Sequence, residues 1–562
     1  MSLKKLPYFL LYALFCLSCA KQSVPSGGPK DTIPPKLIST IPPQNQLNFK
    51  GKELSFTFSE NIAIVNPKEQ IIIAPSINKE FDAVAKNKVV TFTFERDLSD
   101  TTTYSINFRD AVKDVTEKNA VVNLKFAFST GPYIDSLSID GTTSDLLRDK
   151  PLKDITIALY QNSDTFLIFK HKPVYMTKTN EAGAFKLENL KNGLYYIYAF
   201  DDKNRNLIVD SKNESYAFLA DTLRLAKNIT KLKLTLVRLD ARPLKITSAK
   251  PYSNYFNIRV SKSLTNYNLK VDPDTTTAIS CFGDDNSNVR IYNTFPTTLD
   301  SIKVKFHASD SIQNQVDSTL YIKFSKKEPK LEKFDMTLDP VTVSDKTGNF
   351  QTKIIFNKPI ATINFDSIFF RPDSVTIVPF TDQDITWDFD TNTATITKKL
   401  DKKYFTLEPT AQSPQKQPLK KGKRSITNLL YLGRSAFISI DRDTSKAATV
   451  DTKVLRDEDT GIIRITIKTS EPNFVCQLLT ADFKVVNSTA NKTQFQFQNI
   501  KPGEYSIRLI ADKNGNGKWD PGNFNTRTEP EPVTFYHNEK NKDTKISVKA
   551  NWDIGPLLIT FP

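Results

Sequence analysis

Apolar and polar residues alternate in short runs along most of the chain. The clearest runs place a large apolar side chain at every second position, in Leu54–Phe58, Val90–Phe94, Tyr104–Phe108 and Leu124–Phe128. A period of two puts one face of a strand in a core and the other in water. Turn residues separate the runs, and no long segment has the period of a helix. The pattern predicts an all-β chain of tandem antiparallel β-sandwich domains.

The length of the chain indicates several such domains. At about 100–150 residues each, 562 residues make about five. We expect them to follow one another as a rod. Their expected ranges are 36–132, 133–241, 242–328, 329–446 and 447–562, after a signal peptide at 1–18 and a tether at 19–35.

The N-terminus has the pattern of an export signal. Lys4 and Lys5 precede a twelve-residue apolar run over 6–17, followed by Ser18 and Cys19. The run is shorter than the roughly 20 residues that span a bilayer. This arrangement resembles the signal peptide of a bacterial lipoprotein, which implies cleavage before Cys19 and lipidation of its thiol. Several acyl chains would then hold the protein on a membrane.

One position departs from the lipoprotein pattern. Cys16 stands where lipoproteins usually have Leu, so an ordinary secretory signal with an incidental cysteine is the alternative. Residues 20–35 are rich in Pro, Gly and Ser and read as a spacer. Surface export of Bacteroidota-like lipoproteins tends to follow acidic residues just after the cysteine, and here the first acid is Asp31. The resemblance therefore implies an outer-membrane lipoprotein, periplasm-facing or on the cell surface, and the missing acidic residues favour the periplasmic side.

Four segments of the first domain carry a second resemblance. They are DTIPPKLISTIPP (31–43), LSFTFSENI (54–62), TTTYSINFRDAVKD (101–114) and FAFSTG (126–131). In this order they resemble the S-layer-type (SbsA-like) bacterial Ig-like domain, which heads many lipoproteins of Bacteroidota-like bacteria. KIIFNKPI (353–360) has the same strand-then-turn shape as LSFTFSENI. We therefore expect a second Ig-like domain at 329–446.

The chain also contains an internal repeat. Residues 185–210 align without gaps to residues 495–520, with eleven identities in 26 positions. Two domains therefore share one fold. The pattern F-x-x-x-N-[L/I]-K-x-G-x-Y resembles a transthyretin-like or carboxypeptidase-regulatory-like sandwich. In that family the glycine, here Gly193 and Gly503, lies in a tight turn, and we expect it to have a positive φ.

The second copy of the repeat ends in a candidate calcium loop. Asp512, Asn514, Asn516 and Asp520 place side-chain oxygens at loop positions 1, 3, 5 and 9, around Gly517 at position 6. This is the spacing of a calcium loop. The carbonyl of Lys518 could add a ligand at position 7.

The candidate loop is poor in carboxylates. Position 12 is Asn523 rather than the usual Glu, so Asp512 and Asp520 are the only carboxylates unless Glu529 or Glu531 folds back. Few charges imply weak affinity, of about 10⁻⁴–10⁻³ M. The alternative is a turn closed by Asn and Asp side chains on their own backbone.

The first copy keeps the same spacing in a weaker form. Asp202, Asn204, Asn206 and Asp210 recur, but Leu207 replaces the glycine. Calcium is thus the one cofactor that the sequence suggests, and this loop is the lesser candidate.

Catalytic motifs are absent from the sequence. His171, His307 and His537 lie in different expected domains, without metal-ligand spacing, and His307 is expected at a surface or edge. No HExxH, GxSxG, Walker or GxGxxG motif occurs. We therefore expect a protein that is not an enzyme, while an undetected hydrolase with carboxylates paired only in space remains an alternative.

The charge of the chain changes this picture little. The net charge is +15, and the loss of Lys4 and Lys5 with the signal leaves +13. Lysines are interleaved with Asp and Glu, which favours a solvated surface over a nucleic-acid groove. The densest basic stretch, Lys398 to Arg424, is rich in Pro and reads as an exposed loop.

Cysteines and tryptophans offer few further candidates. Cys281 and Cys476 are expected to be buried thiols rather than a disulfide. Trp387, Trp519 and Trp552 could stack on sugars, but packing is the expected role.

The expected function is structural or adhesive. A lipid-anchored cell-envelope protein would present Ig-like and transthyretin-like modules to another envelope protein or a glycan. A glycan-binding accessory lipoprotein of an uptake system is the alternative.

Overall fold

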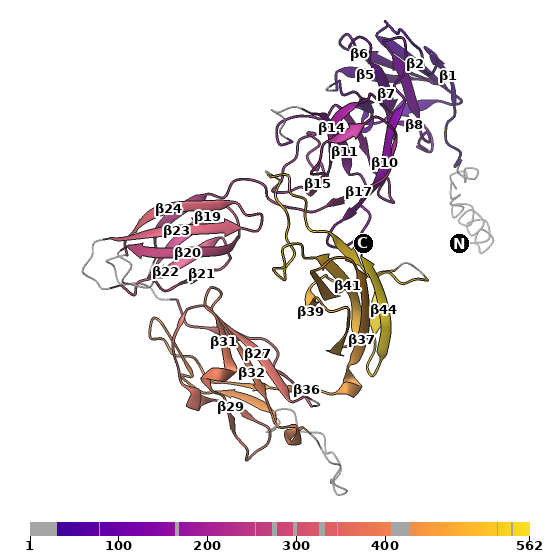
Figure 1. The fold of residues 1–562 in the computed structure, drawn as a ribbon. Coiled ribbons are helices and arrows are strands. Elements are labelled where there is room, and N and C mark those ends of the chain that lie inside the picture. The colour runs from indigo at the N-terminus through magenta and orange to yellow at the C-terminus, as the bar shows by residue number, and fades with distance from the viewer. Residues whose placement is uncertain are drawn as a thin grey trace, which may run out of the picture.

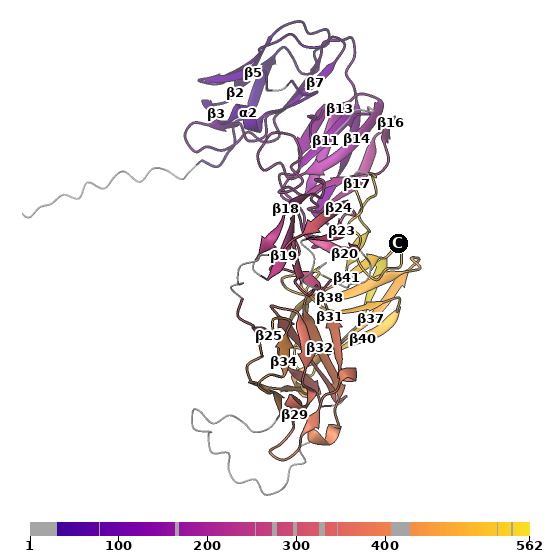
Figure 2. The same ribbon diagram turned by 90° about the vertical axis from the view of Figure 1, so that its left-hand side faces the viewer.

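The protein is described by a computed structural model that shows β-structure throughout (Figures 1 and 2). The structure describes residues 31–77, 79–162, 168–252, 254–272, 278–295, 301–324, 332–345, 347–405, 428–524, 526–540 and 543–561. Within these ranges the α-helix is α2 (Pro67–Gln70), and the other helices are 3-10 turns of three residues. No helix in the described ranges is long and apolar enough to cross a membrane. Cys16, Cys19 and most of the basic loop, residues 406–427, lie outside them.

The first module is a sandwich with a phenylalanine core. One sheet has the order β1-β2-β6-β5, the other β4-β7-β9, and β3 pairs with β8. The bounds are β1 Leu37–Ile41, β2 Glu53–Phe58, β3 Ile62–Ile64, β4 Ile72–Ala74, β5 Phe81–Lys86, β6 Val89–Phe94, β7 Thr103–Asn107, β8 Val112–Asp114 and β9 Lys125–Ser129. The predicted runs became β2, β6, β7 and β9, and Phe56, Phe92 and Phe128 are fully buried. The predicted alternation is confirmed here.

The second module pairs a three-stranded sheet with a five-stranded sheet. Their orders are β13-β10-β17 and β12-β11-β14-β15, with β16 also on β14. The bounds are β10 Leu137–Asp145, β11 Thr156–Gln161, β12 Tyr175–Lys178, β13 Ala184–Leu190, β14 Gly193–Phe200, β15 Tyr216–Phe218, β16 Leu223–Leu225 and β17 Ile229–Leu236. The strands β10 and β17 run parallel, and the other pairs are antiparallel.

The fifth module repeats this topology strand for strand. Its sheets have the orders β40-β37-β44 and β39-β38-β41-β42, with β43 also on β41. The bounds are β37 Gly461–Thr469, β38 Phe474–Thr480, β39 Val485–Ala490, β40 Gln494–Ile500, β41 Gly503–Ala511, β42 Val533–Phe535, β43 Ile546–Val548 and β44 Asp553–Phe561. The parallel pair recurs as β37 with β44. The sequence repeat is thus a repeat of the fold.

The glycines of the repeat do not have the predicted positive φ. Gly193 and Gly503 begin the strands β14 and β41. The left-handed residues of the motif are instead Asn189 and Asn499, each with φ +57°. At Gly193 a Cβ would lie 3.2 Å from the ring of Tyr195, so the glycine makes room for this ring.

The fourth module has the topology of the first. The strand β27, which contains most of KIIFNKPI, occupies the place of β2; β28 and β34 pair as β3 and β8 do, and β29-β33-β35 matches β4-β7-β9. The bounds are β25 Met336–Leu338, β26 Thr342–Ser344, β27 Asn349–Phe356, β28 Ile360–Ile363, β29 Ile368–Arg371, β30 Val378–Pro379, β31 Ile385–Asp388, β32 Thr393–Lys399, β33 Leu429–Leu432, β34 Phe437–Ser439, β35 Ala448–Asp451 and β36 Lys453–Leu455. The strands β35 and β36 pair with β33 and β26, so the range 447–562 begins with two strands of the fourth module's sheets.

The third module is a smaller sandwich. Its sheets have the orders β18-β19-β22-β21 and β20-β23-β24. The bounds are β18 Ile246–Tyr252, β19 Tyr255–Val260, β20 Leu264–Asp272, β21 Ser280–Phe282, β22 Asn288–Tyr292, β23 Ile302–Asp310 and β24 Gln315–Ile322.

The modules do not form a simple rod. The fifth module, yellow in Figure 1, lies back against the second and third, and one of its loops reaches the second module. The extended arrangement expected from the sequence is therefore wrong, because that expectation counted the modules in chain order and took no account of contacts between distant ones.

The phenylalanine core predicts a large effect of one truncation. Phe56 has no exposed surface and contacts Phe108 and Phe126 edge to face at 4.9 and 5.2 Å between ring centroids. We expect Phe56→Ala to lower the free energy of unfolding of the first module by about 3–5 kcal/mol. Hydrogen exchange of peptides from this module measures the loss. Val84→Ala, at a side chain that is 54% exposed, is the control, and an equal loss there would contradict the core assignment.

Candidate functional site

The two predicted calcium loops take the same place in the two copies of the repeat. Residues 202–214, the first loop, follow β14, and residues 512–531, the second loop, follow β41. Each loop leads from the central strand of a five-stranded sheet into an edge strand, β15 or β42. The repeat thus presents two equivalent loops for comparison.

A buried aspartate organises each loop. Asp512 is 2% exposed, and its two carboxylate oxygens accept hydrogen bonds from the backbone N–H groups of Asn516 (3.0 Å) and Gly517 (2.8 Å). In the first loop Asp202 accepts from Asn206 (3.0 Å) and Leu207 (3.2 Å) in the same way. The aspartate therefore fixes the turn by supplying acceptors to backbone donors.

The replacement of glycine by Leu207 does not change the turn. Leu207 has φ +61° and its counterpart Gly517 has φ +76°. Arg205 and Gly515 likewise have φ +59° and +72°. The hydrogen bonds to Asp202 hold two side-chain-bearing residues in a conformation that favours glycine.

A second buried carboxylate closes each loop. Glu531 folds back, and its oxygens accept from the backbone N–H groups of Lys513 (2.7 Å) and Asp520 (2.9 Å). Burial raises the pKa of Glu531 above its ordinary value, while these hydrogen bonds act in the opposite direction. Glu214 does the same in the first loop, with Lys203 (3.0 Å) and Asp210 (2.8 Å).

The sequence analysis missed Glu214. The gap-free repeat ends at Asp210 and Asp520, and the two glutamates lie at different distances beyond it. A comparison of the segments that lead into β15 and β42 would have aligned them.

The second loop brings together the side chains that the calcium prediction named. The amide nitrogens of Asn514 and Asn516 donate to one oxygen of Asp520, at 2.6 and 2.7 Å, and Asn516 accepts from the N–H of Lys518 at 2.8 Å. The oxygens thus already take part in the turn that was the alternative interpretation. In the described part of the chain no three His, Cys, Asp or Glu residues are grouped to hold a metal ion. Calcium binding stays a prediction for both loops.

The second loop contains an insertion that the first lacks. Four positions separate Asp210 from Glu214, whereas eleven separate Asp520 from Glu531. The additional residues between Asp520 and Glu531 carry Phe524. This segment leaves its own module and lies against the second module and the third.

Phe524 packs into an aromatic cluster of the second module. Its ring lies 4.8 Å from Phe169, 5.5 Å from Phe218 and 6.0 Å from Tyr216, measured between centroids. The same cluster contains Ile312 of the third module. Side chains of three modules therefore meet in one apolar cluster.

Arg527 adds directional contacts beside Phe524. Its guanidinium donates to the carbonyl oxygens of Leu219 and Ala220, both at 2.8 Å. It also lies 4.3 Å from the ring centroid of Tyr196, in cation–π geometry, and 3.3 Å from the hydroxyl of Tyr198. We call the contacts of residues 523–529 with the second and third modules the clasp.

Polar contacts extend the clasp at its edges. The carboxylate of Glu529 accepts from the N–H of Ala220 (2.6 Å), and the amide of Asn523 donates to the carbonyl of Ile312 (2.9 Å). Farther away, His537 meets Asp149 of the second module at 2.8 Å. The fifth module is thus held at several points.

The other candidates from the sequence do not form a site. Cys281 and Cys476 are free and buried, as predicted. His307 is half exposed and contacts Asp317 at 2.8 Å. Trp387 packs against the core of the fourth module, Trp519 donates to the carbonyl of Glu531 (3.1 Å), and Trp552 is 45% exposed on the fifth module.

Comparison with protein families gives a match in the first module and another in the fifth. Residues 31–130 match the bacterial Ig-like domain. The resemblance found in the sequence is confirmed at this level. Residues 454–548 match DUF2141, an uncharacterized protein conserved in bacteria. The second family covers most of the fifth module, so the clasp belongs to a DUF2141 domain.

Comparison with solved structures gives matches of low similarity. The N-terminal part of the S-layer protein SbsC is 11% identical with a TM-score of 0.13, covering 52% of this chain and 45% of that one. SbsC domains 1–6 are 12% identical (TM-score 0.15; 92% and 67%), and the major pilin subunit BcpA of Bacillus cereus is 12% identical (TM-score 0.12; 76% and 99%). The chain thus spans less than half of the first of these structures, and TM-scores this low carry no argument about fold or function. A comparison with curated proteins gives no match.

The loop geometry predicts the effect of removing its central carboxylate. We expect Asp512→Ala to lower the free energy of unfolding of the fifth module by about 1–3 kcal/mol, because two backbone N–H groups lose their acceptor. Hydrogen exchange of this module, measured with a calcium chelator present, isolates this loss. Lys518→Ala in the exposed part of the loop is the control. A larger loss in millimolar calcium than in chelator would show that the loop also binds the ion, and no loss in chelator would contradict the turn assignment.

Proposed function

We propose that this protein is a non-enzymatic structural or adhesive protein of the bacterial cell envelope, built as a closed scaffold of β-sandwich modules. The observation that carries the proposal is the clasp. It connects the last module to the second and third, and it is made by an insertion that the other copy of the repeat does not have.

A closed arrangement of modules is stiffer than an open chain of modules, and stiffness suits a structural or adhesive role. Modules joined end to end can bend at each linker, and contacts between modules are often small enough to allow such motion. A contact between distant modules removes several of these motions at once. Because the chain itself tethers the two surfaces, their high effective concentration lets a small contact stay closed.

The location and partners follow from the sequence. In this proposal lipid on Cys19 holds the scaffold at the outer membrane, periplasm-facing or on the cell surface. The partner would be another envelope protein or a glycan, and the charge pattern argues against nucleic acid. The bacterial Ig-like domain at residues 31–130 supports a modular, non-catalytic chain.

The two alternative functions, glycan binding and hydrolysis, have less support. Glycan capture by stacking would need a shared aromatic platform, whereas Trp387 packs against the core of one module and Trp552 is exposed on another. A hydrolase would need convergent acidic or histidine side chains, and the buried Asp512 and Glu531 are engaged with backbone N–H groups.

The clasp predicts a change of shape when it is broken. We expect the double variant Phe524→Ala, Arg527→Ala to increase the radius of gyration in small-angle X-ray scattering, because the fifth module swings away from the second. Thr526→Ala, at an exposed residue between them, should leave the curve unchanged. An unchanged radius of gyration in the double variant would show that the clasp does not hold the modules.

The proposed lipid anchor predicts that membrane association depends on Cys19. We expect Cys19→Ser to abolish metabolic labelling with a fatty-acid analogue and to release the protein from the membrane fraction, whereas Cys16→Ser should retain both. Protease shaving of intact cells, with a tag at the C-terminus, then gives the side of the membrane. Protection until the outer membrane is opened is the expected result, and loss of the tag on intact cells would place the scaffold outside.

A further inference from the structure

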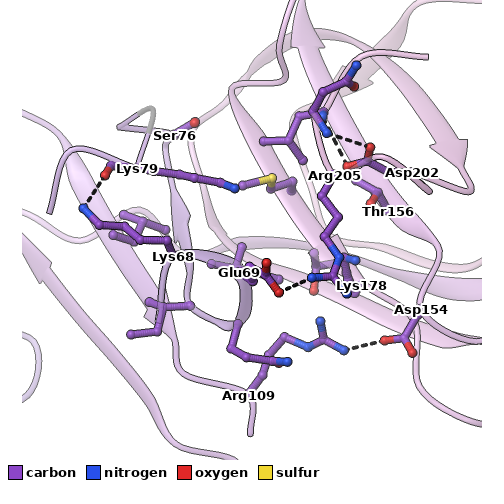
Figure 3. Close-up of a pocket in the computed structure, with 18 of the residues that line it drawn as sticks. Lys68, Glu69, Ser76, Lys79, Arg109, Asp154, Thr156, Lys178, Asp202 and Arg205 are labelled. Carbon is purple, nitrogen blue, oxygen red and sulfur yellow. Dashed lines mark hydrogen bonds and ion pairs between the residues drawn. The ribbon is translucent and has the colours of Figure 1, made fainter. Parts of the chain in front are cut away.

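One face of the second module's five-stranded sheet is covered by other modules rather than by its own second sheet. Register places Lys178 beside Thr156 and Thr156 beside Phe200, and the next row holds Met176, Ala158 and Tyr198. The aromatic part of this face is covered by the clasp. Lys178 and Thr156, at the other end, face a cavity against the first module (Figure 3).

The two walls of this cavity are firmly joined. Ala74 of the first module is buried in the core of the second, and the N–H of Ser76 donates to the carbonyl of Val174 at 2.7 Å. Lys125 and Glu188 form an ion pair across the joint at 2.5 Å. The cavity is therefore preformed, as most small-molecule sites are.

The cavity is large and positively charged. Its volume is about 780 Å³, within the range of about 300–1,000 Å³ typical of ligand sites. Eight cationic side chains line it against five carboxylates. An excess of one charge in a recess concentrates ligands of the opposite charge.

Most of the cations have partners. Arg109 pairs with Asp154 at 2.5 Å, and Arg205 pairs with Glu69 (Figure 3). Lys68 donates to the carbonyl of Lys79 at 2.8 Å. These contacts use side chains of both modules and fix the rim of the cavity.

Lys178 differs from the paired cations because it is half buried in the wall and has no such partner in the part of the chain that the structure describes. Among the described residues none forms a hydrogen bond or ion pair with its ammonium group. Burial lowers its pKa, and the charge of Arg109 lowers it further. An anion bound here would stabilise the charged form of Lys178, because it would replace the hydration that the half-buried ammonium has lost.

Two buried polar atoms among the residues that line the cavity also lack partners. Thr156 is 1% exposed, and its hydroxyl makes no hydrogen bond; the side-chain oxygen of Gln70, in α2 of the first module, is buried and unpaired as well. Such atoms cost stability unless a bound group satisfies them. The hydroxyl can donate or accept, whereas the oxygen of Gln70 can only accept.

We propose that this cavity binds a small sugar that carries an anionic group. The anion would pair with Lys178, and sugar hydroxyls would meet Thr156 and donate to Gln70. An inorganic anion without a hydroxyl, such as sulfate, would leave Gln70 without a donor, and a neutral sugar would leave the Lys178 ammonium without a hydrogen-bonded counter-charge. The pattern of unpaired groups thus selects a ligand with both features.

Binding of defined probes to the full mature chain tests this proposal. Glucuronic acid and glucose 6-phosphate distinguish a carboxylate from a phosphate as the anion. Glucose lacks the charge, and inorganic sulfate lacks a hydroxyl donor. In isothermal titration calorimetry we expect at least one acidic sugar to bind, more tightly than either single-feature probe and more weakly at high salt.

Three variants locate the site. Lys178→Met should weaken binding of the acidic sugar by about tenfold or more, since a charge-assisted hydrogen bond is lost, and Thr156→Val should weaken it less. Lys233→Met, at an exposed lysine on the other sheet of the module, should have no effect. Unchanged circular dichroism confirms that the variants fold.

Three results would overturn the proposal. They are the absence of binding by both acidic sugars at millimolar concentration, equal binding by Lys178→Met, or binding of inorganic sulfate as tight as that of glucose 6-phosphate. The result is independent of the scaffold proposal, because the scattering experiment on the clasp does not involve this cavity.

Discussion

The outer face of the five-stranded sheet in the second module is the surface on which the assembly depends. The inner face packs on the module's own core, through Ile157, Leu159 and Ile197. The outer face carries Ala158, Tyr160, Tyr198 and Phe200, which would cost free energy if left in water. An isolated copy of the module would therefore expose an aromatic surface. The other modules cover this surface, and this packing fixes how they are arranged around the second module.

The two ends of that face have different roles because they carry different side chains. At the aromatic end, Phe524 contributes apolar area and Arg527 fixes the orientation through hydrogen bonds to two carbonyl groups. At the polar end, Thr156 and Lys178 leave unsatisfied groups beside the first module. Apolar burial closes the scaffold at one end, while a polar, charged recess remains at the other. The first, second and fifth modules thus meet on a single sheet.

The repeat shows how one loop framework serves two purposes. Asp202 with Glu214, and Asp512 with Glu531, hold the same turn with the same backbone donors. Because these carboxylates fix both ends of the loop, the segment between them can lengthen without disturbing the strands. In the fifth module the longer segment makes the contacts of the clasp. In the second module the corresponding loop is short, and its Arg205 instead reaches Glu69 across the cavity.

Local patterns in the sequence determined the strands, the sandwich class and the repeat, because period-two burial and turn residues act over a few positions. The alternation at Phe56 and Phe92 and the alignment of Asp202 with Asp512 needed no knowledge of distant contacts. The glycine prediction failed because Asn189, rather than Gly193, takes the left-handed position. Phe524, Lys178 and Gln70 have no pattern of their own in the sequence. Their roles arise only where modules far apart in the chain meet, since burial and the presence of a partner are properties of the folded arrangement.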